Sequence, residues 1–207
     1  MLSDRKLPVG VQDFEKLRLG QNIYVDKTRH LYNLIKLPIS YFISRPRRFG
    51  KSLFLSTIMA YFRGQKELFD GLEIAKLEKE WVEYPVIYID LNKAAYQNEQ
   101  TLKNVLNEIL KQYESMWEVT NIADELSLRF DNLIQTAHEK SRQKVVVLID
   151  EYDKPLINSL HKSEINDSIR EILKGFYGVL KSADAHLHFV FITGVTKFSH
   201  VSVFSDL

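Results

Sequence analysis

Short apolar runs recur along this chain, separated by longer stretches in which the apolar positions are spaced differently. The runs predict strands that are buried on both faces, and they cover residues 39–44, 86–91, 145–150 and 188–194. In the intervening stretches, apolar residues recur at intervals of three and four, which is the spacing of an amphipathic helix. This spacing predicts helices over residues 27–37, 52–63, 100–117, 123–142 and 163–183.

Strands that alternate with helices predict an α/β fold with a mostly parallel sheet and helices on both faces. We expect residues 39–207 to form one core domain that is truncated on its C-terminal side. Residues 1–38 are expected to form a leader and a helix packed on that core. The leader is expected to be irregular from Leu7 to Gly20, and Asp26 is expected to cap the helix that follows.

Composition excludes several classes of protein. The 207 residues include no cysteine, which rules out disulfides, cysteine-ligated zinc and thiol catalysis. The net charge of +1 creates no overall field toward nucleic acid or membrane, so such a partner would need a local patch. No apolar run approaches the roughly 18 residues of a membrane helix, and the first residues do not resemble a signal peptide. We expect a soluble, cytoplasmic protein with no membrane partner.

The turn after the first strand carries the pattern of a phosphate-binding loop that leads into a helix. Leu53 follows the loop, which reads Arg45-Pro46-Arg47-Arg48-Phe49-Gly50-Lys51-Ser52. The N-terminus of a helix offers unpaired N–H groups and a partial positive charge to a triphosphate. We expect Gly50 to let the backbone approach the phosphates, Lys51 to reach the outer phosphates and Ser52 to ligate Mg²⁺. Residues 45–53 are therefore candidate nucleotide ligands.

One position of this loop departs from the usual pattern, which has glycine where this chain has Arg45. Pro46 beside it has a fixed φ angle and stiffens the loop. Arg45, Arg47 and Arg48 either surround the phosphates with positive charge or turn outward toward a partner. Taken alone, the stretch fits a basic surface turn before a helix equally well.

A phosphate-binding loop requires a carboxylate at the end of a later buried strand, where it can hold magnesium. The strand over residues 145–150 ends in Asp150, and Glu151 follows it. We expect Asp150 to hold Mg²⁺ and Glu151 to orient and activate the attacking water. The other interpretation is a strand that ends in a solvated turn. Thr193 ends the last strand and fits the polar sensor of ATPases that have an extra strand between the loop strand and the acidic strand.

Two further positions each have two interpretations. Asp90 ends the strand over residues 86–91, where open α/β sheets bind their ligands, and it fits either a ligand contact or a turn. Asp26 and Lys27 lie close in sequence to the loop and fit either the nucleotide pocket or a capped connecting helix.

Five motifs together resemble the bacterial AAA-ATPase-like family, over essentially the whole chain. They are Leu7-Pro8-Val9-Gly10-Val11-Gln12-Asp13-Phe14, Tyr24-Val25-Asp26-Lys27-Thr28, the loop from Arg45 to Ser52, Leu148-Ile149-Asp150-Glu151-Tyr152-Asp153-Lys154-Pro155 and Phe191-Ile192-Thr193-Gly194-Val195. The resemblance accounts for the arginine-rich loop, which that family carries where other phosphate-binding loops have glycine. It implies a P-loop NTPase that uses ATP and Mg²⁺, with Lys51 and Ser52 as phosphate and metal contacts and Asp150 and Glu151 as the acidic pair. Asp153 belongs to the same signature and by its chemistry fits either the magnesium shell or the cap of a turn.

Members of that family are usually longer and carry a C-terminal domain that resembles restriction nucleases. By this resemblance the chain is the N-terminal ATPase part, and a nucleic-acid partner would be bound through the missing domain. We expect an enzyme that hydrolyses Mg-ATP to ADP and phosphate and thereby drives a conformational switch, and self-association is a further expectation. The alternatives are a P-loop kinase for a small acceptor and a nucleotide-binding scaffold without turnover.

Overall fold

The computed structural model describes residues 6–37 and 40–196. Within these ranges, four parallel strands form a sheet in the order β1-β4-β3-β2. Their bounds are β1 Ser40–Ser44, β2 Val86–Asp90, β3 Val145–Asp150 and β4 Leu187–Gly194. Strand β4 lies between β1, which precedes the arginine-rich loop, and β3, which ends in the acidic pair. This order confirms the extra strand that the sequence predicts.

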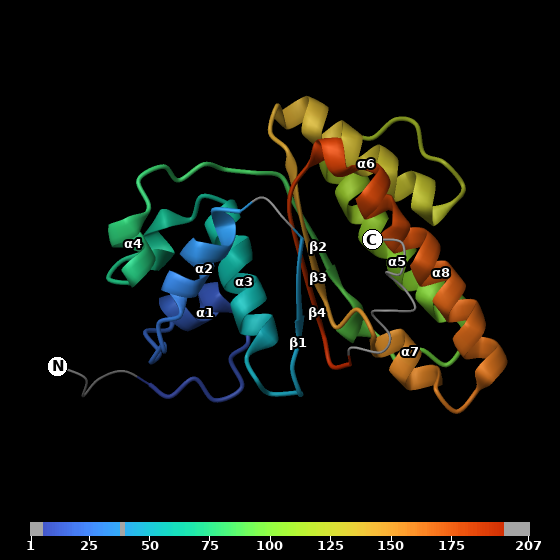
Figure 1. The fold of residues 1–207 in the computed structure, drawn as a ribbon, viewed down its shortest axis with the longest axis horizontal. Helices are drawn as coiled ribbons and strands as arrows, with labels where there is room; N and C mark the ends of the chain where they lie inside the picture. The colour runs from blue at the N-terminus through green and yellow to red at the C-terminus, as the bar shows by residue number, and fades with distance from the viewer. Residues whose placement is uncertain (1–5, 38–39, 197–207) are drawn as a thin grey trace.

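Helices cover both faces of the sheet, as expected (Figure 1). One face carries α1 Phe14–Leu19, α2 Thr28–Ile35, α3 Lys51–Phe62 and α4 Glu73–Leu77. The other face carries α5 Glu99–Met116, α6 Leu126–Ser141, α7 Lys154–Ser159 and α8 Ser163–Ser182. Short 3₁₀ helices connect these elements, namely η1 Lys66–Phe69, η2 Leu91–Lys93 and η3 Asp184–His186. In the described ranges, no helix combines the length and the apolar character needed to cross a membrane.

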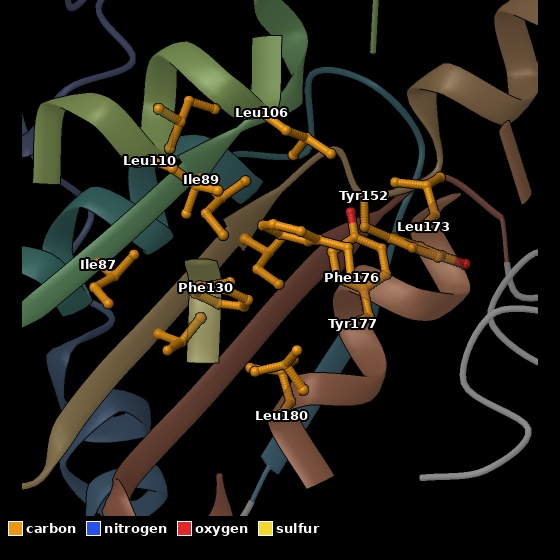
Figure 2. Close-up of a cluster of buried hydrophobic side chains, with 14 of the residues drawn as sticks. Ile87, Ile89, Leu106, Leu110, Phe130, Tyr152, Leu173, Phe176, Tyr177 and Leu180 are labelled. Atoms are coloured by element: carbon orange, nitrogen blue, oxygen red, sulfur yellow. The ribbon is translucent and has the colours of Figure 1, made fainter. Parts of the chain in front are cut away.

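Two hydrophobic cores result, because successive strand residues point to opposite faces of a sheet. Ile87, Ile89, Val147 and Ile149 pack under α5, α6 and α8, in the cluster that Figure 2 shows around Phe130 and Phe176. The alternate strand positions pack under α1, α2 and α3, and they include Val146, Leu148, Phe189 and Phe191. Strands buried on both faces explain why the sequence shows continuous apolar runs and not an alternating pattern.

The leader contains a helix where the sequence predicts irregular chain, and that prediction is wrong. Helix α1 begins after Asp13, whose carboxylate accepts a hydrogen bond of 2.8 Å from the Lys16 amide. Phe14 and Leu17 are buried, and Phe14 belongs to the cluster under α3. A helix of six residues has too few turns to display a periodic pattern, so its packing becomes visible only in the structure.

The charged segment after α3 forms an outer layer over the helices of that face. Phe69 packs against Phe14 with tilted rings whose centroids are 4.9 Å apart, and the ring centroids of Tyr61 and Trp81 are 5.4 Å apart. Helix α4 packs against α2, on the side of that helix away from the sheet (Figure 1). The scattered apolar residues of this segment therefore hold the leader, α2 and α3 together.

Candidate functional site

The loop between β1 and α3 turns through two residues in the left-handed conformation. Arg48 has a φ of 68° and Gly50 a φ of 74°. No atom lies within 4 Å of the place that a Cβ at Gly50 would take, so the φ angle and not crowding calls for glycine there. Gly50 contributes no side-chain cap to α3, which leaves the N–H groups of the first helical turn open to an anion.

Lys51 begins α3, and its side chain folds back under the loop. Its ammonium donates to the carbonyl oxygens of Arg45 at 3.0 Å and Pro46 at 3.3 Å. It also lies 3.3 Å from Oε1 of Glu151. The lysine side chain is 5% exposed and the glutamate side chain 13%. The sequence places these two residues about a hundred positions apart, and the fold brings them into one ion pair.

The acidic end of β3 is fixed by Thr193 of the neighbouring strand. The Thr193 hydroxyl donates to Oδ1 of Asp150 and accepts from the Glu151 amide at 3.3 Å. Asp150 and Thr193 are both buried. Glu151 has a φ of 54°, so the chain turns sharply as it leaves the strand. The structure thus brings Asp150, Glu151 and Thr193 together with Lys51, as the sequence predicts.

A cavity of 410 Å³ lies beside the start of α3 and the ends of β2 and β3. Ser52 and Asp150 form one part of its wall, and Asp90 and Asn92 form another. Asp90 pairs in register with Asp150, and its carboxylate accepts a hydrogen bond of 2.7 Å from the Asn92 amide. Burial raises the pKa of Asp90, that hydrogen bond opposes the rise, and the charge of Asp150 adds to it. Asp90 therefore closes a turn and also lines the cavity.

The donors of this cavity suit a magnesium ion. Mg²⁺ prefers oxygen ligands, commonly one or two carboxylates together with water and phosphate oxygens. The hydroxyl of Ser52 and the carboxylate of Asp150 come from different elements and line the same cavity. These two residues fit the ion that the sequence predicts for them.

Two hollows flank the arginine-rich loop, and Lys27, Phe49, Gly50 and Phe54 line both. The first, of 420 Å³, is mainly apolar and aromatic, and its other lining residues are Pro8, Leu17, Ile23, Tyr24, Val25, Arg48 and Leu53. The second, of 390 Å³, reaches the buried end of the loop, and its other lining residues are His30, Phe42, Ile43, Ser44, Arg45, Lys51, Phe191 and Thr193. The loop is thus open to ligands on more than one side.

Asp26 lies outside these hollows, and its carboxylate makes contacts within the fold. It accepts hydrogen bonds of 2.8 Å from the Thr28 and Glu73 amides and one of 2.7 Å from the Thr28 hydroxyl. Burial alone would raise the pKa of Asp26, but the hydrogen bonds outweigh it and hold the pKa below its ordinary value. Asp26 therefore joins the start of α2 to the start of α4.

The remaining loop residues lie at the surface. Pro46, Arg47 and Phe49 are exposed, and Phe49 is exposed by 64% although it is a large apolar residue. Arg45 is also exposed, and its guanidinium donates to the Ser44 carbonyl at 3.1 Å.

Sequence reasoning assigned no site role to the leader, yet residues 10–13 line the cavity beside Ser52 and Asp150. The Phe14 amide donates to the Ser56 hydroxyl of α3 at 2.9 Å, which anchors this stretch to the helix. The motif from Leu7 to Phe14 was the sequence feature that could have indicated this contribution to the cavity. Asp153 of the acidic motif makes no side-chain cap to the helix that it precedes, and its carboxylate instead accepts hydrogen bonds from the Val195 and Thr196 amides after β4.

Two comparisons with known proteins each found a match to this chain. Residues 8–204 match a family described as Predicted AAA-ATPase. A protein of Azotobacter chroococcum mcd 1, named "Uncharacterized protein in vnfD 5'region", is 42% identical over 207 residues. The match covers 100% of this chain and 40% of that protein, so the chain spans two fifths of the length of this relative. The chain belongs to the family of predicted AAA-ATPases and is a nucleotide-binding, ATPase-like domain.

Proposed function

We propose that this chain binds Mg-ATP at the loop from Arg45 to Ser52 and hydrolyses it to ADP and phosphate. The observation that carries the proposal is the ion pair between Lys51 and Glu151, at 3.3 Å, beside the buried Asp150. A phosphate-binding cation and a carboxylate that can direct water stand within reach of one another at the N-terminus of a helix.

Lys51 exchanges its partners when a triphosphate enters. In the structure its ammonium is held by two loop carbonyls and by Glu151. Phosphate oxygens carry more negative charge than carbonyls, so the ammonium turns to them and helps to neutralise the transferred group. Arg45 and Arg48 belong to the same loop, line the hollows beside it and add positive charge as the reaction proceeds.

Glu151 becomes available once Lys51 has left it. Its carboxylate then orients the attacking water in line with the γ-phosphate and accepts the water's proton. Thr193 holds Asp150 with its hydroxyl and Glu151 through the amide of that residue, which keeps the two carboxylates in a fixed relation. Ser52 and Asp150 would hold Mg²⁺, which supplies charge neutralisation at the phosphates.

The 420 Å³ hollow beside the loop suits the nucleoside part of the ligand. Tyr24, Phe49 and Phe54 offer aromatic faces for a planar base, and Lys27 and Arg48 add positive charge at its rim. Lys27 thereby receives a role in nucleotide binding, whereas the carboxylate of Asp26 supports the position of its neighbours through Thr28 and Glu73.

Transfer of phosphate to a small acceptor is the alternative that one specific observation favours. The 410 Å³ cavity adjoins Ser52 and Asp150 and is large enough for a small molecule. Its lining includes Asp90, a carboxylate that could accept a hydrogen bond from an acceptor hydroxyl.

A phosphate-release assay separates these possibilities. Purified chain is incubated with ATP and Mg²⁺ alone, with candidate small acceptors and with DNA, and ATP binding is followed by calorimetry. Hydrolysis predicts phosphate release without any acceptor. Release or transfer that requires an acceptor would favour the kinase, and ATP binding without loss of phosphate would favour a scaffold. A chain that does not bind ATP at all would overturn the proposal.

A further inference from the structure

The residues that follow β3 are interlocked with the residues that end and follow β4. The Tyr152 amide donates to the Thr193 carbonyl at 3.0 Å, and the Tyr152 hydroxyl donates to the Thr196 carbonyl at 2.9 Å. Oδ2 of Asp153 accepts from the Val195 amide at 3.0 Å, the Thr196 amide at 2.7 Å and the Thr196 hydroxyl at 2.9 Å. Thr193 is also hydrogen-bonded to Asp150 and Glu151. Each of the residues 150–153 therefore has at least one hydrogen bond to residues 193–196.

Asp153 is fully buried in this interlock, with a relative exposure of 0%, as are Tyr152 and Thr193. Its carboxylate is stabilised by donors from Val195 and Thr196 and not by the proposed nucleotide site. It is absent from the lining of the three hollows described above, which are those around the loop and the ends of β2 and β3. A buried carboxylate with several N–H and O–H donors holds its surroundings in one arrangement, because losing any donor leaves charge uncompensated.

Close packing between Gly194 and Tyr152 further restricts the movement of residues 150–153 relative to residues 193–196. A Cβ at Gly194 would lie 2.3 Å from Cε1 of Tyr152, so the backbone of β4 runs directly against that ring. The ring itself belongs to the core cluster, where Figure 2 shows it with Leu173 and Tyr177. The two segments therefore move together or not at all.

Glu151 sits between the anchored residues and has a φ of 54°. A non-glycine residue keeps such a conformation only where its neighbours over-determine it. Asp150 is held on one side by Thr193, and Asp153 is held on the other by Val195 and Thr196. The side chain that pairs with Lys51 is thus aimed from two sides, and the contacts of Asp153 with Val195 and Thr196 lie outside the lining of the three hollows.

We propose that Asp153 is a positioning residue, which holds Glu151 in its working orientation by anchoring the turn to Thr196. This proposal rests on the proposed hydrolysis for its kinetic consequence, and it assigns Asp153 a role in turnover rather than in ATP or magnesium binding. It also makes residues 193–196 the segment that responds when Lys51 leaves Glu151 for the phosphates of the nucleotide.

The kinetic test uses variants that alter the anchor by one hydrogen-bonding group. Thr196→Val removes the hydroxyl donor at nearly constant shape, Thr196→Ser keeps it, and Asp153→Asn removes the charge. Asp167→Asn serves as the matched control, because Asp167 has a side-chain exposure of 69% and lies on α8. For each variant kcat, KM, the dissociation constant for ATP and the melting temperature are measured.

We expect Asp153→Asn to lower kcat about tenfold or more while KM and ATP affinity stay within about twofold. Thr196→Val is expected to lower kcat in the same way by a smaller factor, with Thr196→Ser and Asp167→Asn close to wild type. A wild-type kcat in Asp153→Asn would overturn the proposal. A parallel loss of ATP affinity and melting temperature would also overturn it, since that result describes a general structural role.

Hydrogen exchange gives a second test that needs no turnover. The amides of Glu151 and Tyr152 are bonded to Thr193 and are expected to be protected in the wild-type chain. Thr196→Val should speed exchange in the peptide covering residues 150–153, and Thr196→Ser should restore it. If the wild-type chain released no phosphate, the proposed hydrolysis would fail. The exchange result alone would then decide whether Thr196 anchors the turn that carries Glu151. Equal exchange in Thr196→Val and Thr196→Ser would then refute the anchor.

Discussion

The ammonium of Lys51 lies 3.3 Å from Oε1 of Glu151, in a pair whose two side chains are 5% and 13% exposed. Lys51, the candidate phosphate-binding cation, is thus held against Glu151, the candidate water-activating carboxylate. Entry of a triphosphate offers Lys51 a more highly charged partner and releases Glu151. In this account, the activation of water is coupled to the binding of ATP, because one ion pair must break before the other contacts form.

Removal of the Lys51 ammonium tests whether this side chain binds the phosphates of ATP. Lys51→Ala is expected to weaken ATP binding by at least about tenfold, since a charge-assisted hydrogen bond contributes roughly 1.5–3 kcal/mol. Calorimetric titration with Mg-ATP gives the dissociation constant, and Lys66→Ala, at an exposed residue of η1, is the control. An unchanged dissociation constant in Lys51→Ala would rule out the loop as the phosphate site.

Gly194 is predicted to tolerate no side chain. In Gly194→Ala the new Cβ would meet the Tyr152 ring at 2.3 Å, and such overpacking costs about 1–3 kcal/mol of unfolding free energy. The matched control is Gly175→Ala in the interior of α8, where no atom lies within 4 Å of the added Cβ. That substitution should stabilise the chain by roughly 0.5–1 kcal/mol, because alanine favours helix. Urea denaturation measures both, and equal effects would contradict the packing described for β4.

The ion pair between Arg129 and Glu114 is predicted to be important for stability. Its two hydrogen bonds measure 2.7 and 2.6 Å, and the side chains are 7% and 4% exposed. Glu114→Gln should lower the free energy of unfolding by about 3–5 kcal/mol, because it leaves a buried guanidinium without its counter-charge.

The control for that experiment is Glu108→Gln on the same helix. Glu108 pairs with Lys111 at 3.3 Å, but the two side chains are 72% and 60% exposed. Solvent-exposed pairs contribute no more than about 1 kcal/mol, so the change should be small. A similar loss in both variants would show that burial does not set the strength of these pairs.

His188 is predicted to make stability depend on pH. Burial lowers its pKa below the ordinary 6.5, and the charge of Lys144 lowers it further. The folded chain then binds fewer protons than the unfolded chain in the window between the lowered pKa and 6.5. The contribution of His188 to folding stability is therefore fully present above pH 6.5 and is lost as the pH falls through that window.

Replacing the imidazole while keeping its ring contact isolates this effect. His188 stacks on Tyr84 with centroids 4.2 Å apart, and His188→Phe preserves an aromatic ring there. Melting temperatures of the two chains should diverge as the pH decreases below 6.5, with the wild type losing more. Parallel melting curves across this range would refute the prediction.

The sequence predicted the parallel sheet, the extra strand and the approximate bounds of the four described strands, for a physical reason. Parallel strands buried on both faces leave continuous apolar runs, and the polar residues Asp90, Asp150 and Thr193 lie at or beside their carboxyl ends, on one edge of the sheet. The loop and the acidic pair could be connected because each is a local motif whose chemistry requires the other.

Contacts between residues distant in the chain were not accessible in this way. The bond from the Glu73 amide to Asp26 spans 47 positions, and the bonds from Thr193 to residues 150–151 depend on β4 lying beside β3. Likewise, the burial of α1 depends on α3, whose own pattern gives no indication of a partner from the leader. Short helices and side-chain hydrogen bonds are set by packing and not by local periodicity.

The most direct measurement of the central claim is a single-turnover experiment with Glu151→Gln. Enzyme in excess is mixed with labelled ATP and Mg²⁺, and the bound nucleotide is analysed over time beside wild type and Glu164→Gln, an exposed control at the start of α8. The account predicts that wild type and control convert bound ATP to ADP, while Glu151→Gln retains ATP with at least wild-type affinity. Conversion by Glu151→Gln at the wild-type rate would contradict it, because Glu151 would then have no part in activating water.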